Sequence, residues 1–359
     1  MMMLIRTYLL ALLLAALVSI NSTSLGVVQQ PISPILSTGN TILHVGGNGP
    51  GNYSAVQDAV DDAMKGDTVF VYDDSSPYNE HVVLIKSITL KGEHRDTTII
   101  NEEANNAVIT IVADNVTLTN FTLHTSGPKV KGIQVNSSAD VTIVHNTISN
   151  AYDGISLRYV RDTTIVDNTI HHCQRSGIGG YTVNTTTIRG NNISYNGLFG
   201  IIANRMNGSV IEHNTITDNY WDGIVLQYCV HTMIRGNTLE GSLYYGINLQ
   251  STHNYDNTIY FNNFLNNGDH ARGENKNAWD NGWKGNYWDD YGEKYPDACK
   301  KIFGTWAIPY EISGGTNKDT CPLISLYTQK HSWVLEPPIC FLQQLQMRFL
   351  KRESFFSRS

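Results

Sequence analysis

Four charged residues have the types that chemistry on an acidic sugar would require. They are Asp153, Arg158, Arg175 and Asp222. Elimination or epimerisation at C5 of a uronate needs a base, and a cation that neutralises the carboxylate as enolate-like charge develops. The two carboxylates are candidates for the base and the two guanidinium groups are candidates for the cation. A uronate lyase or C5-epimerase is therefore one hypothesis for this chain.

The spacing of the two carboxylates limits that hypothesis. Asp153 and Asp222 each stand directly before the glycine of a repeated phrase, three repeats apart. If the repeats stack at the strand spacing of about 4.8 Å, the carboxylates lie roughly 14 Å apart. Hydrolases that use two carboxylates hold them closer than this. We expect no compact catalytic constellation, and catalysis remains an alternative.

Aromatic, amide and charged residues recur at the same repeat positions. Aromatic rings stack on the apolar faces of sugars, and amides bond sugar hydroxyls. A row of such residues along one face suits an extended glycan, although an ordinary solvated sheet face has similar composition. The candidate carbohydrate-binding residues are Tyr152, Arg158, Tyr181, Trp221, Asp222, Gln227, Tyr244, Tyr245 and Gln250.

Three histidines are candidate metal ligands. His171 and His172 precede Cys173, and His145 lies one repeat earlier. Imidazole and thiolate suit copper, but adjacent residues of a strand point to opposite faces. The alternative is a set of surface imidazoles beside a buried thiol. No cofactor is required by this pattern, and copper or calcium stays a possibility.

Two phrases repeat through the chain with one shared period. A glycine followed by an apolar residue, usually Ile, recurs at steps of 22 or 23 residues at Gly132, Gly154, Gly177, Gly200, Gly223 and Gly246. An apolar-x-x-Asn-x-apolar phrase recurs with the same period around Asn146, Asn168, Asn191, Asn214, Asn237 and Asn262. Such a period indicates a solenoid.

The repeat predicts an all-β, single-stranded right-handed parallel β-helix with coils of about 22–23 residues. Leucine-rich repeats have a similar length, but each unit here carries two β-rich runs and no 3.6-residue rhythm. We expect Ile155, Ile178 and their equivalents to stack inward, each after a glycine that leaves room for the turning backbone. We expect the asparagines to form a structural ladder that bonds buried turn backbone.

A solenoid needs caps at both ends. We predict an N-terminal cap over residues 41–70, with a short helix that Ser54 caps and that buries Ala55, Val56, Ala59, Val60 and Ala63. The whole β-helix spans residues 41–323, with regular coils over about 116–265 and a Trp-, Gly- and Asn-rich C-terminal cap over 266–323. Residues 324–359 are basic and aromatic and stay unassigned, as a flexible tail or a frameshifted product.

The N-terminus predicts export. Arg6 precedes an apolar run from Tyr8 to Ile20 and then small polar residues, which is the order of a signal peptide, assigned to residues 1–24. We expect a secreted or cell-surface protein, with membrane contact only through an uncleaved N-terminal segment. Asn-x-Ser/Thr triplets, which fit a glycoprotein or chance, begin at Asn21, Asn52, Asn115, Asn120, Asn136, Asn184, Asn192 and Asn207.

The cysteines indicate the compartment of the protein, and its net charge limits the partners that it can bind. Cys299 and Cys321 flank one C-terminal segment and are the candidates for a disulfide. A net charge of −7 and a pI of about 5.9 give no field that attracts nucleic acid, so no nucleic-acid partner is expected.

Terminal motifs make the chain resemble a known family. They are LHVGGNGPGNYSAVQDAVDDA, then GDTVFV, then WDNG-x-x-x-GNYWDDY, and finally IPYEISGGTNKDTCPL. With the coils between them, from about His44 to Leu323, they resemble the NosD-like right-handed parallel β-helix proteins. The resemblance implies a pectate-lyase-like superfold, an association with carbohydrate binding and sugar hydrolysis, and a family name tied to copper delivery. Relatives often carry an acidic Asp-x-Asp-Gly-like stretch where this chain has YPDACKKIFGTWAIPY, which weakens the case for calcium there.

We therefore expect an exported or cell-surface β-helix protein that binds polysaccharide or cell-envelope glycans, or forms part of the envelope, without catalysis. A polysaccharide lyase or epimerase is the first alternative. A copper-handling accessory protein is the second.

Overall fold

The computed structural model describes residues 40–104, 107–125, 127–274, 276–301 and 303–328. Contacts divide the chain into Met1–Gly39 and Asn40–Ser359, and the fold described here belongs to the second unit. The predicted signal peptide (1–24) and residues 329–359 of the predicted tail lie outside the described residues. Within the described part of the chain, no helix is long and apolar enough to cross a membrane.

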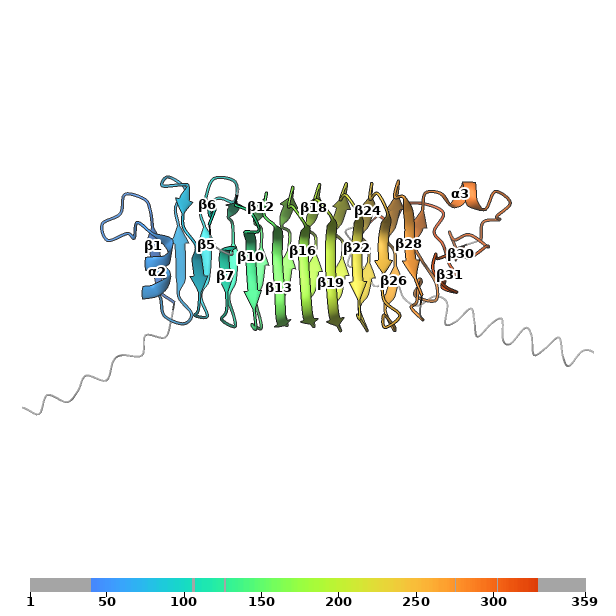
Figure 1. The fold of residues 1–359 in the computed structure, drawn as a ribbon, viewed down its shortest axis with the longest axis horizontal. Coiled ribbons are helices and arrows are strands. Elements are labelled where there is room, and N and C mark those ends of the chain that lie inside the picture. Colours follow the sequence, from blue (N-terminus) through green and yellow to red (C-terminus); the bar gives the residue numbers. More distant parts are fainter. Residues whose placement is uncertain (1–39, 105–106, 126, 275, 302, 329–359) are drawn as a thin grey trace, which may run out of the picture. The chain divides into compact units, whose positions relative to one another are not determined.

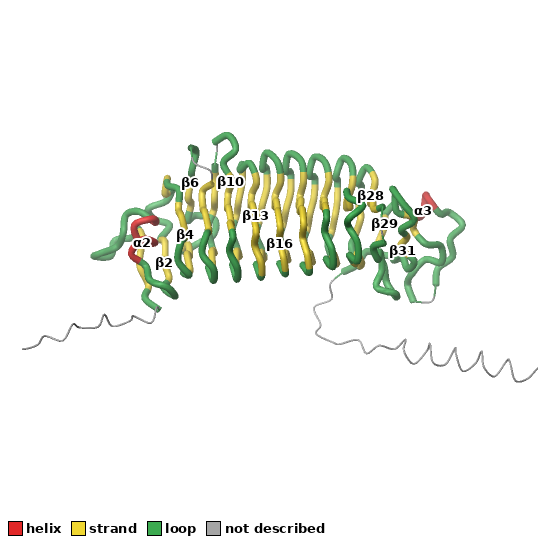
Figure 2. Tube along the Cα trace, turned by 60° about the horizontal axis from the view of Figure 1, so that its bottom comes forward, coloured by secondary structure: helices red, strands yellow, loops and turns green. Residues whose placement is uncertain are grey.

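The described unit is a parallel β-helix of three long sheets, which confirms the predicted fold class (Figure 1, Figure 2). The chain visits the first, third and second sheet in turn, so each sheet gains one strand per coil. The first sheet comprises β1 (Ile42–Val45), β2 (Thr68–Val71), β5 (Thr89–Gly92), β8 (Thr117–Thr119), β11 (Thr142–Val144), β14 (Thr164–Val166), β17 (Thr187–Arg189), β20 (Val210–Glu212), β23 (Met233–Arg235) and β26 (Thr258–Tyr260).

The second and third sheets are built in the same way. The second comprises β4 (Val82–Leu84), β7 (Ala107–Ile111), β10 (Lys131–Asn136), β13 (Asp153–Arg161), β16 (Ser176–Asn184), β19 (Phe199–Asn207), β22 (Asp222–Gln227), β25 (Tyr245–Leu249) and β28 (Asp269–Gly273). The third comprises β3 (Tyr78–Asn79), β6 (Ile99–Asn101), β9 (Thr122–His124), β12 (Thr147–Ser149), β15 (Thr169–His171), β18 (Asn192–Ser194), β21 (Thr215–Thr217), β24 (Thr238–Glu240), β27 (Asn263–Leu265) and β29 (Tyr287–Trp288).

The repeated isoleucines form the core, as predicted. Ile155 pairs with Ile178 and Ile178 with Ile201 in the parallel register of the second sheet, and all three are buried. The preceding glycines are required by close packing: a Cβ on Gly154 would lie 2.4 Å from Ile170 Cγ2 and 2.6 Å from the Gly177 carbonyl oxygen. Any larger residue there would push neighbouring coils apart.

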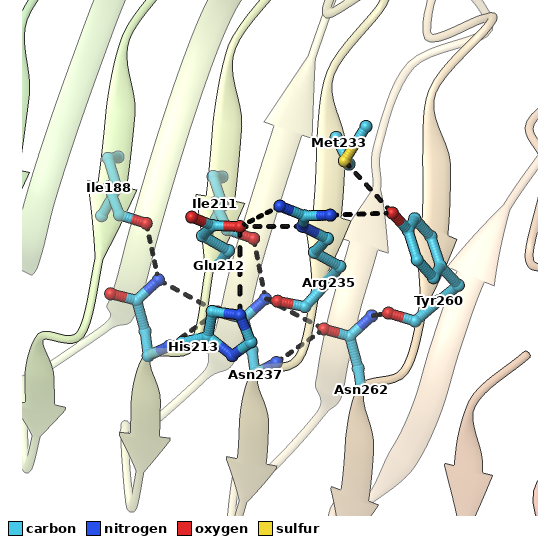
Figure 3. Close-up of polar contacts among 10 residues, drawn as sticks. Ile188, Ile211, Glu212, His213, Met233, Arg235, Asn237, Tyr260 and Asn262 are labelled. Atoms are coloured by element: carbon cyan, nitrogen blue, oxygen red, sulfur yellow. Dashed lines mark hydrogen bonds and ion pairs between the residues drawn. The ribbon is translucent and has the colours of Figure 1, made fainter. Parts of the chain in front are cut away.

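The asparagine ladder is also confirmed, and it has a direction (Figure 3). The amide Nδ2 of Asn214 donates to Asn237 Oδ1 at 3.0 Å, and Asn237 Nδ2 donates to Asn262 Oδ1 at 2.9 Å. Each Oδ1 also accepts the backbone N–H of the preceding ladder residue, as Asn237 Oδ1 does from Asn214 at 2.9 Å. The ladder continues beyond the predicted repeats through Asn286, whose N–H donates to Asp319 Oδ2 at 2.7 Å. Each coil is thus bonded to the next through a buried amide.

The N-terminal helix closes the first coils but is not capped as predicted. Helix α2 (Val56–Asp62) buries Val56, Ala59 and Val60. Ser54 lies outside the helix, and the N-cap residue makes no side-chain capping bond. The Glu80 carboxylate instead accepts the N–H groups of Val56 and Gln57, both at 2.8 Å. The Glu80 carboxylate takes the place of a local serine cap because its full negative charge binds the unpaired N–H groups at the helix N-terminus more strongly than a hydroxyl does.

Aromatic rings and one buried carboxylate close the other end. Trp288 stacks between Phe264 at 4.3 Å and Tyr310 at 4.1 Å. Helix α3 (Tyr291–Lys294) and the hairpin of β30 (Tyr310–Glu311) and β31 (Lys318–Asp319) complete this cap. Asp319 is fully buried, and a Cβ on Gly285 would lie 1.8 Å from its Oδ1, so only glycine fits there.

The folded part of the chain extends a few residues into the segment that we predict as a tail. Residues 324–328, assigned to the tail from sequence, pack back along the solenoid. Tyr327 stacks on Phe261 at 4.7 Å, and its backbone exchanges hydrogen bonds with the Asn263 side chain. The folded unit therefore extends at least to Thr328.

Replacing Asn191 by alanine should lower the free energy of unfolding by about 2–4 kcal/mol. The change removes the acceptor of the Asn168 N–H and the donor to the Ile165 carbonyl, which both stay buried. Chemical denaturation of the unglycosylated protein measures the effect. Asn192→Ala is the matched control, because this neighbour is exposed, and should change stability by less than about 0.5 kcal/mol. Equal effects would show that the ladder adds no stability.

Candidate functional site

The outer face of the second sheet carries the predicted rows of polar and aromatic residues. Arg158 pairs with Tyr181, Tyr181 with Asn204, and Asn204 with Gln227 in the parallel register. Asn204 Nδ2 donates to Gln227 Oε1 at 3.0 Å, and Gln227 Nε2 donates to Gln250 Oε1 at 2.7 Å. A line of amides thus runs along the solenoid axis.

A pocket of about 510 Å³ opens on this face. It lies over β10, β13, β16, β19 and the end of β22, and we call it the central pocket. Its lining consists of Lys131, Tyr152, Asp153, Ser156, Leu157, Arg158, Tyr159, Arg175, Gly179, Gly180, Tyr181, Ile202, Asn204 and Gln227. Of the predicted carbohydrate-binding residues it gathers Tyr152, Arg158, Tyr181 and Gln227.

The central pocket exists because one coil lacks side chains at its floor. Gly179 pairs with Ser156 on one side and Ile202 on the other, and it lies in an outward row. A Cβ there would lie 3.2 Å from Arg175 Nη2 and 3.3 Å from Ser176 Oγ, so even a small side chain would crowd these two groups. Sequence reasoning missed this feature, although the signal was present: Gly-Gly at 179–180 replaces side chains that the other coils carry.

Asp153 is held in a buried ion pair and is not free to act as a base. Its side chain is 1% exposed, and Arg175 donates to both carboxylate oxygens, with Nε at 2.8 Å from Oδ1. Ser176 Oγ donates to the same Oδ1. The ion pair raises the pKa of Arg175, whose guanidinium also lies over the Tyr152 ring. The structure thus gives Asp153 a positioning role for Arg175, in contrast to the catalytic role considered from sequence.

Two cations of the central pocket remain without a carboxylate partner. Arg158 is exposed and forms no ion pair within the described residues. Lys131 Nζ donates to Gln134 Oε1 at 2.8 Å. Burial lowers the pKa of Lys131, opposed by Asp153 and reinforced by Arg158 and Arg175. The pocket is therefore cationic, although the whole chain is acidic. Lys131 is not among the site residues that we predict from the sequence.

Asp222 lies apart from the central pocket, three strands from Asp153 in the register. Its carboxylate accepts the Tyr245 N–H at 2.8 Å and Asn248 Nδ2 at 3.2 Å, and burial raises its pKa. The two aspartates are not brought together, as the spacing predicted. No residue pair of the two-carboxylate kind is formed by these candidates.

The remaining aromatic candidates form a separate row beside the pocket. Trp221 meets Phe199 edge-on at 5.7 Å and Tyr244 edge-on at 6.2 Å. Trp221 and Tyr244 are exposed, while Tyr245 is half-buried and Gln250 exposed. We call Phe199, Trp221 and Tyr244 the aromatic row. It extends the polar face along the axis beyond the central pocket.

The three candidate metal ligands do not form one site. His171 Nδ1 lies 2.8 Å from His172 Nδ1 at the corner between the third and second sheets. His145 lies at the other corner, between β11 and β12, 3.8 Å from Asp167. Burial raises the pKa of the Cys173 thiol to about 12, so it stays protonated. Copper needs donors that converge on one ion. His171 and His172 bring two imidazole nitrogens together, but His145 and the protonated Cys173 thiol do not complete the predicted set.

The predicted disulfide is not formed in the structure. Cys299 and Cys321 are both free. The segment 305–307 lies between them: Lys300 pairs antiparallel with Trp306, and Thr305 with Leu323.

A second polar cluster lies on the outer face of the first sheet (Figure 3). Arg235 donates to Glu212 Oε2 at 2.8 Å and to the Tyr260 hydroxyl at 3.3 Å, and Tyr260 donates to Met233 Sδ at 3.4 Å. Sequence reasoning did not find this cluster. Its groups satisfy one another, and the neighbouring residues His213 and Phe261 stack on Tyr327.

Substituting Asp153 by asparagine should lower the free energy of unfolding by about 2 kcal/mol. A fully buried pair typically loses 3–5 kcal/mol when one partner is removed, but Arg175 is 36% exposed and water screens part of the loss. Thermal and urea unfolding measure it. The exposed pair of Arg161 and Asp162 supplies the control, since water screens it and Asp162→Asn should cost far less than Asp153→Asn. A stable Asp153→Asn variant would contradict the positioning role.

Solved structures of known proteins share the fold. DFA-IIIase from Arthrobacter chlorophenolicus A6, in complex with DFA-III, is similar over 68% of this chain and 75% of its own, with a TM-score of 0.54 and 13% identity. The pectate lyase Pel9A is similar over 70% and 74%, with a TM-score of 0.50 and 13% identity. The A-module of mannuronan C-5 epimerase AlgE4 from Azotobacter vinelandii covers 59% and 72%, with a TM-score of 0.45 and 17% identity. At these identities the likeness is one of fold alone.

A search of curated proteins found no match. The family model described as periplasmic copper-binding protein (NosD) matches residues 60–293, which is more than half of the 359 residues. Its range covers the end of α2, the regular coils and the Trp- and Gly-rich part of the C-terminal cap. The GDTVFV and WDNG-x-x-x-GNYWDDY motifs lie inside the matched range, whereas most of the first motif and all of the last lie outside it. The predicted resemblance to this family is confirmed by the match, and the chain belongs to the NosD family.

Proposed function

We propose that this protein binds an anionic polysaccharide in the central pocket, outside the cytoplasm. The observation that carries the proposal is the pairing of two uncompensated cations, Lys131 and Arg158, with a floor that has no side chain at Gly179. A carboxylated sugar can approach such a floor closely and meet both charges. Charge-assisted hydrogen bonds of this kind are stronger than neutral ones.

Rings and amides around the pocket suit the rest of a sugar chain. Tyr159 meets Tyr181 edge-on at 5.5 Å, and Arg205 donates to the Tyr181 hydroxyl at 3.3 Å. The amides of Asn204 and Gln227 leave donors and acceptors for sugar hydroxyls along the axis. A longer chain that follows this axis would reach the aromatic row, where ring faces can stack on sugars.

Binding without turnover is our preferred form of this proposal. Asp153 is committed to Arg175, and Asp222 lies three strands away, so neither sequence candidate supplies a free base next to the cations. Copper handling is not supported by the donors at His145, His171 and His172. The shared fold with a pectate lyase adds only that sheets of this kind can carry sugar sites.

Turnover of a uronate is the second candidate, and Lys131 is the observation that favours it. Because its pKa is lowered by burial, a larger fraction of its amine is neutral than for an exposed lysine. A neutral amine could accept the C5 proton while Arg158 neutralises the sugar carboxylate. This role would make Lys131 the base in place of either aspartate.

Binding should be tested with a panel of acidic and neutral polysaccharides. We expect the wild type to bind polygalacturonate or alginate in preference to dextran, and to bind more weakly as salt increases. Gly179→Ile, which copies Ile202 of the next coil, should fill the floor and weaken binding at least tenfold. Val225→Ile, in the same row outside the pocket, is the matched control. Equal binding by Gly179→Ile would disprove the proposed pocket.

The same incubations separate binding from turnover. Unsaturated uronate absorbs in the ultraviolet, so elimination would appear as rising absorbance, and epimerisation would appear as a changed sugar ratio. Product that is absent in Lys131→Ala but present in Asp153→Asn would favour the lyase or epimerase. Retained binding with no product in the wild type would favour a sugar-binding solenoid.

As pH rises, affinity for the acidic polysaccharide should fall at a lower pH than the pKa of an exposed lysine would give. Deprotonation of Lys131 removes one positive charge, and its pKa lies below the usual value because the amine is half-buried. Binding is therefore strong below the lowered pKa and is lost as pH rises through it. Lys131→Arg keeps its charge throughout and should abolish this fall. Identical pH profiles for the two proteins would remove Lys131 from the site.

A further inference from the structure

Three metal-ligating side chains converge at the junction between the last coil and the C-terminal cap. His270 lies on β28, and Asp289 and Asp290 follow β29 and lead into α3. His270 Nε2 lies 2.7 Å from Asp289 Oδ1 and 3.3 Å from Asp290 Oδ1. One ligand atom from each residue lies within 4.8 Å of the other two. Three donors are thus directed at one small volume.

Each of these side chains is oriented by a second contact. The other oxygen of Asp289 accepts the Asn266 N–H at 2.7 Å, and that of Asp290 accepts the Tyr310 hydroxyl at 2.9 Å. His270 Nδ1 lies 3.5 Å from Asn267 Nδ2. Such outer contacts are typical of metal sites, where they hold each ligand in one orientation.

Burial separates this cluster from a group of surface charges. The His270 side chain is only 4% exposed. Asp290 Oδ1 is fully buried, and the 3.3 Å approach of His270 Nε2 is too poorly aligned to count as a hydrogen bond. A buried carboxylate oxygen can accept more than one bond, so it has room for a further partner. The carboxylates themselves are 26% and 38% exposed, so an ion and its waters have access from solvent.

We propose that His270, Asp289 and Asp290 form a binding site for a divalent cation of the zinc or manganese type. One imidazole and two carboxylates suit such ions, whereas Cu(I) prefers thiolate and thioether donors that this cluster lacks. The remaining positions would be filled by water. The ion would tie β28 to the segment that enters α3, and so fasten the C-terminal cap to the coils. The proposal is independent of polysaccharide binding.

A second cluster on the chain supplies a natural control. Asp73, Glu93 and His94 also lie within ligand distance of one another. His94 is 67% exposed and Asp73 28% exposed, and Asp73 already accepts bonds from Thr97 and His94. Its carboxylate Asp73 is exposed to a similar degree as those of the proposed site, but its histidine is exposed where His270 is buried. We propose no ion there.

The test uses the full folded chain, stripped with chelator and titrated with Zn²⁺, Mn²⁺, Ca²⁺ and Cu⁺ by calorimetry. We expect one equivalent of Zn²⁺ or Mn²⁺ to bind with a rise in melting temperature that chelator reverses. His270→Gln and Asp289→Asn should each weaken the ion at least tenfold. Tyr310→Phe removes only an outer contact and should weaken it about tenfold. Co²⁺ should give a visible absorption band in the wild type that His270→Gln loses.

Controls keep the result specific. His94→Gln and the exposed Asp297→Asn should leave the stoichiometry and affinity unchanged, and circular dichroism verifies that each variant folds. If a ligand variant fails to fold, Tyr310→Phe replaces it. The Co²⁺ absorption band should then need about tenfold more Co²⁺ than in the wild type, and an unchanged titration would count against the site. The proposal is overturned if the wild type binds no ion, or if binding survives in both His270→Gln and Asp289→Asn.

Discussion

The fold depends on one hydrogen bond repeated from coil to coil, in which a buried asparagine side chain accepts the backbone N–H of the ladder residue before it. This bond serves the buried turn backbone, which water cannot reach and which no strand partner satisfies. It also sets the vertical alignment of the coils, because a slip by one residue would leave both the amide and the backbone N–H unpaired. The isoleucine stacks and the outer rows inherit that alignment.

Because the coils are aligned, the absence of one side chain on the outer face is enough to form a pocket. In a solenoid every coil presents the same outer positions, so a pocket arises where one coil departs from its neighbours. Gly179 removes a side chain from one row while Arg158 and Tyr181 remain in the next. The pocket around Gly179 is lined by Lys131, Arg158 and Arg175, while the Asp153 carboxylate is buried against Arg175. Its charge is therefore more positive than that of the rest of the sheet.

Periodic features were predictable from the sequence, and features that join distant irregular segments were not. The glycine, isoleucine and asparagine columns follow from the period because each coil repeats the same contacts. The spacing also placed Asp153 and Asp222 too far apart to cooperate. The burial of Asp153 could not be predicted from the repeat, because it depends on the Arg175 side chain, which reaches the carboxylate from the next coil.

The caps show the same limit. Ser54 had the right type and place for a helix cap, but Glu80 competes for the helix from another coil, and no local pattern reveals this. His270 meets Asp289 and Asp290 only because the cap turns back on the last strand. Cys299 and Cys321 both lie in this cap, but the segment 305–307 pairs with the residues beside each of them, and both thiols are free.

The last member of the ladder bears on whether these solenoids join end to end. Asp319 accepts the Asn286 N–H and the Trp288 indole on one oxygen and the Cys321 N–H on the other. A carboxylate in that position has no amide N–H to offer, so the pattern of donation that links each coil to the next stops at this residue. Stacked β-structures with open ends tend to recruit further copies into fibres. Because the ladder ends in an acceptor that is covered by stacked aromatic rings, this end of the solenoid offers no free amide donor with which a second copy could continue the ladder.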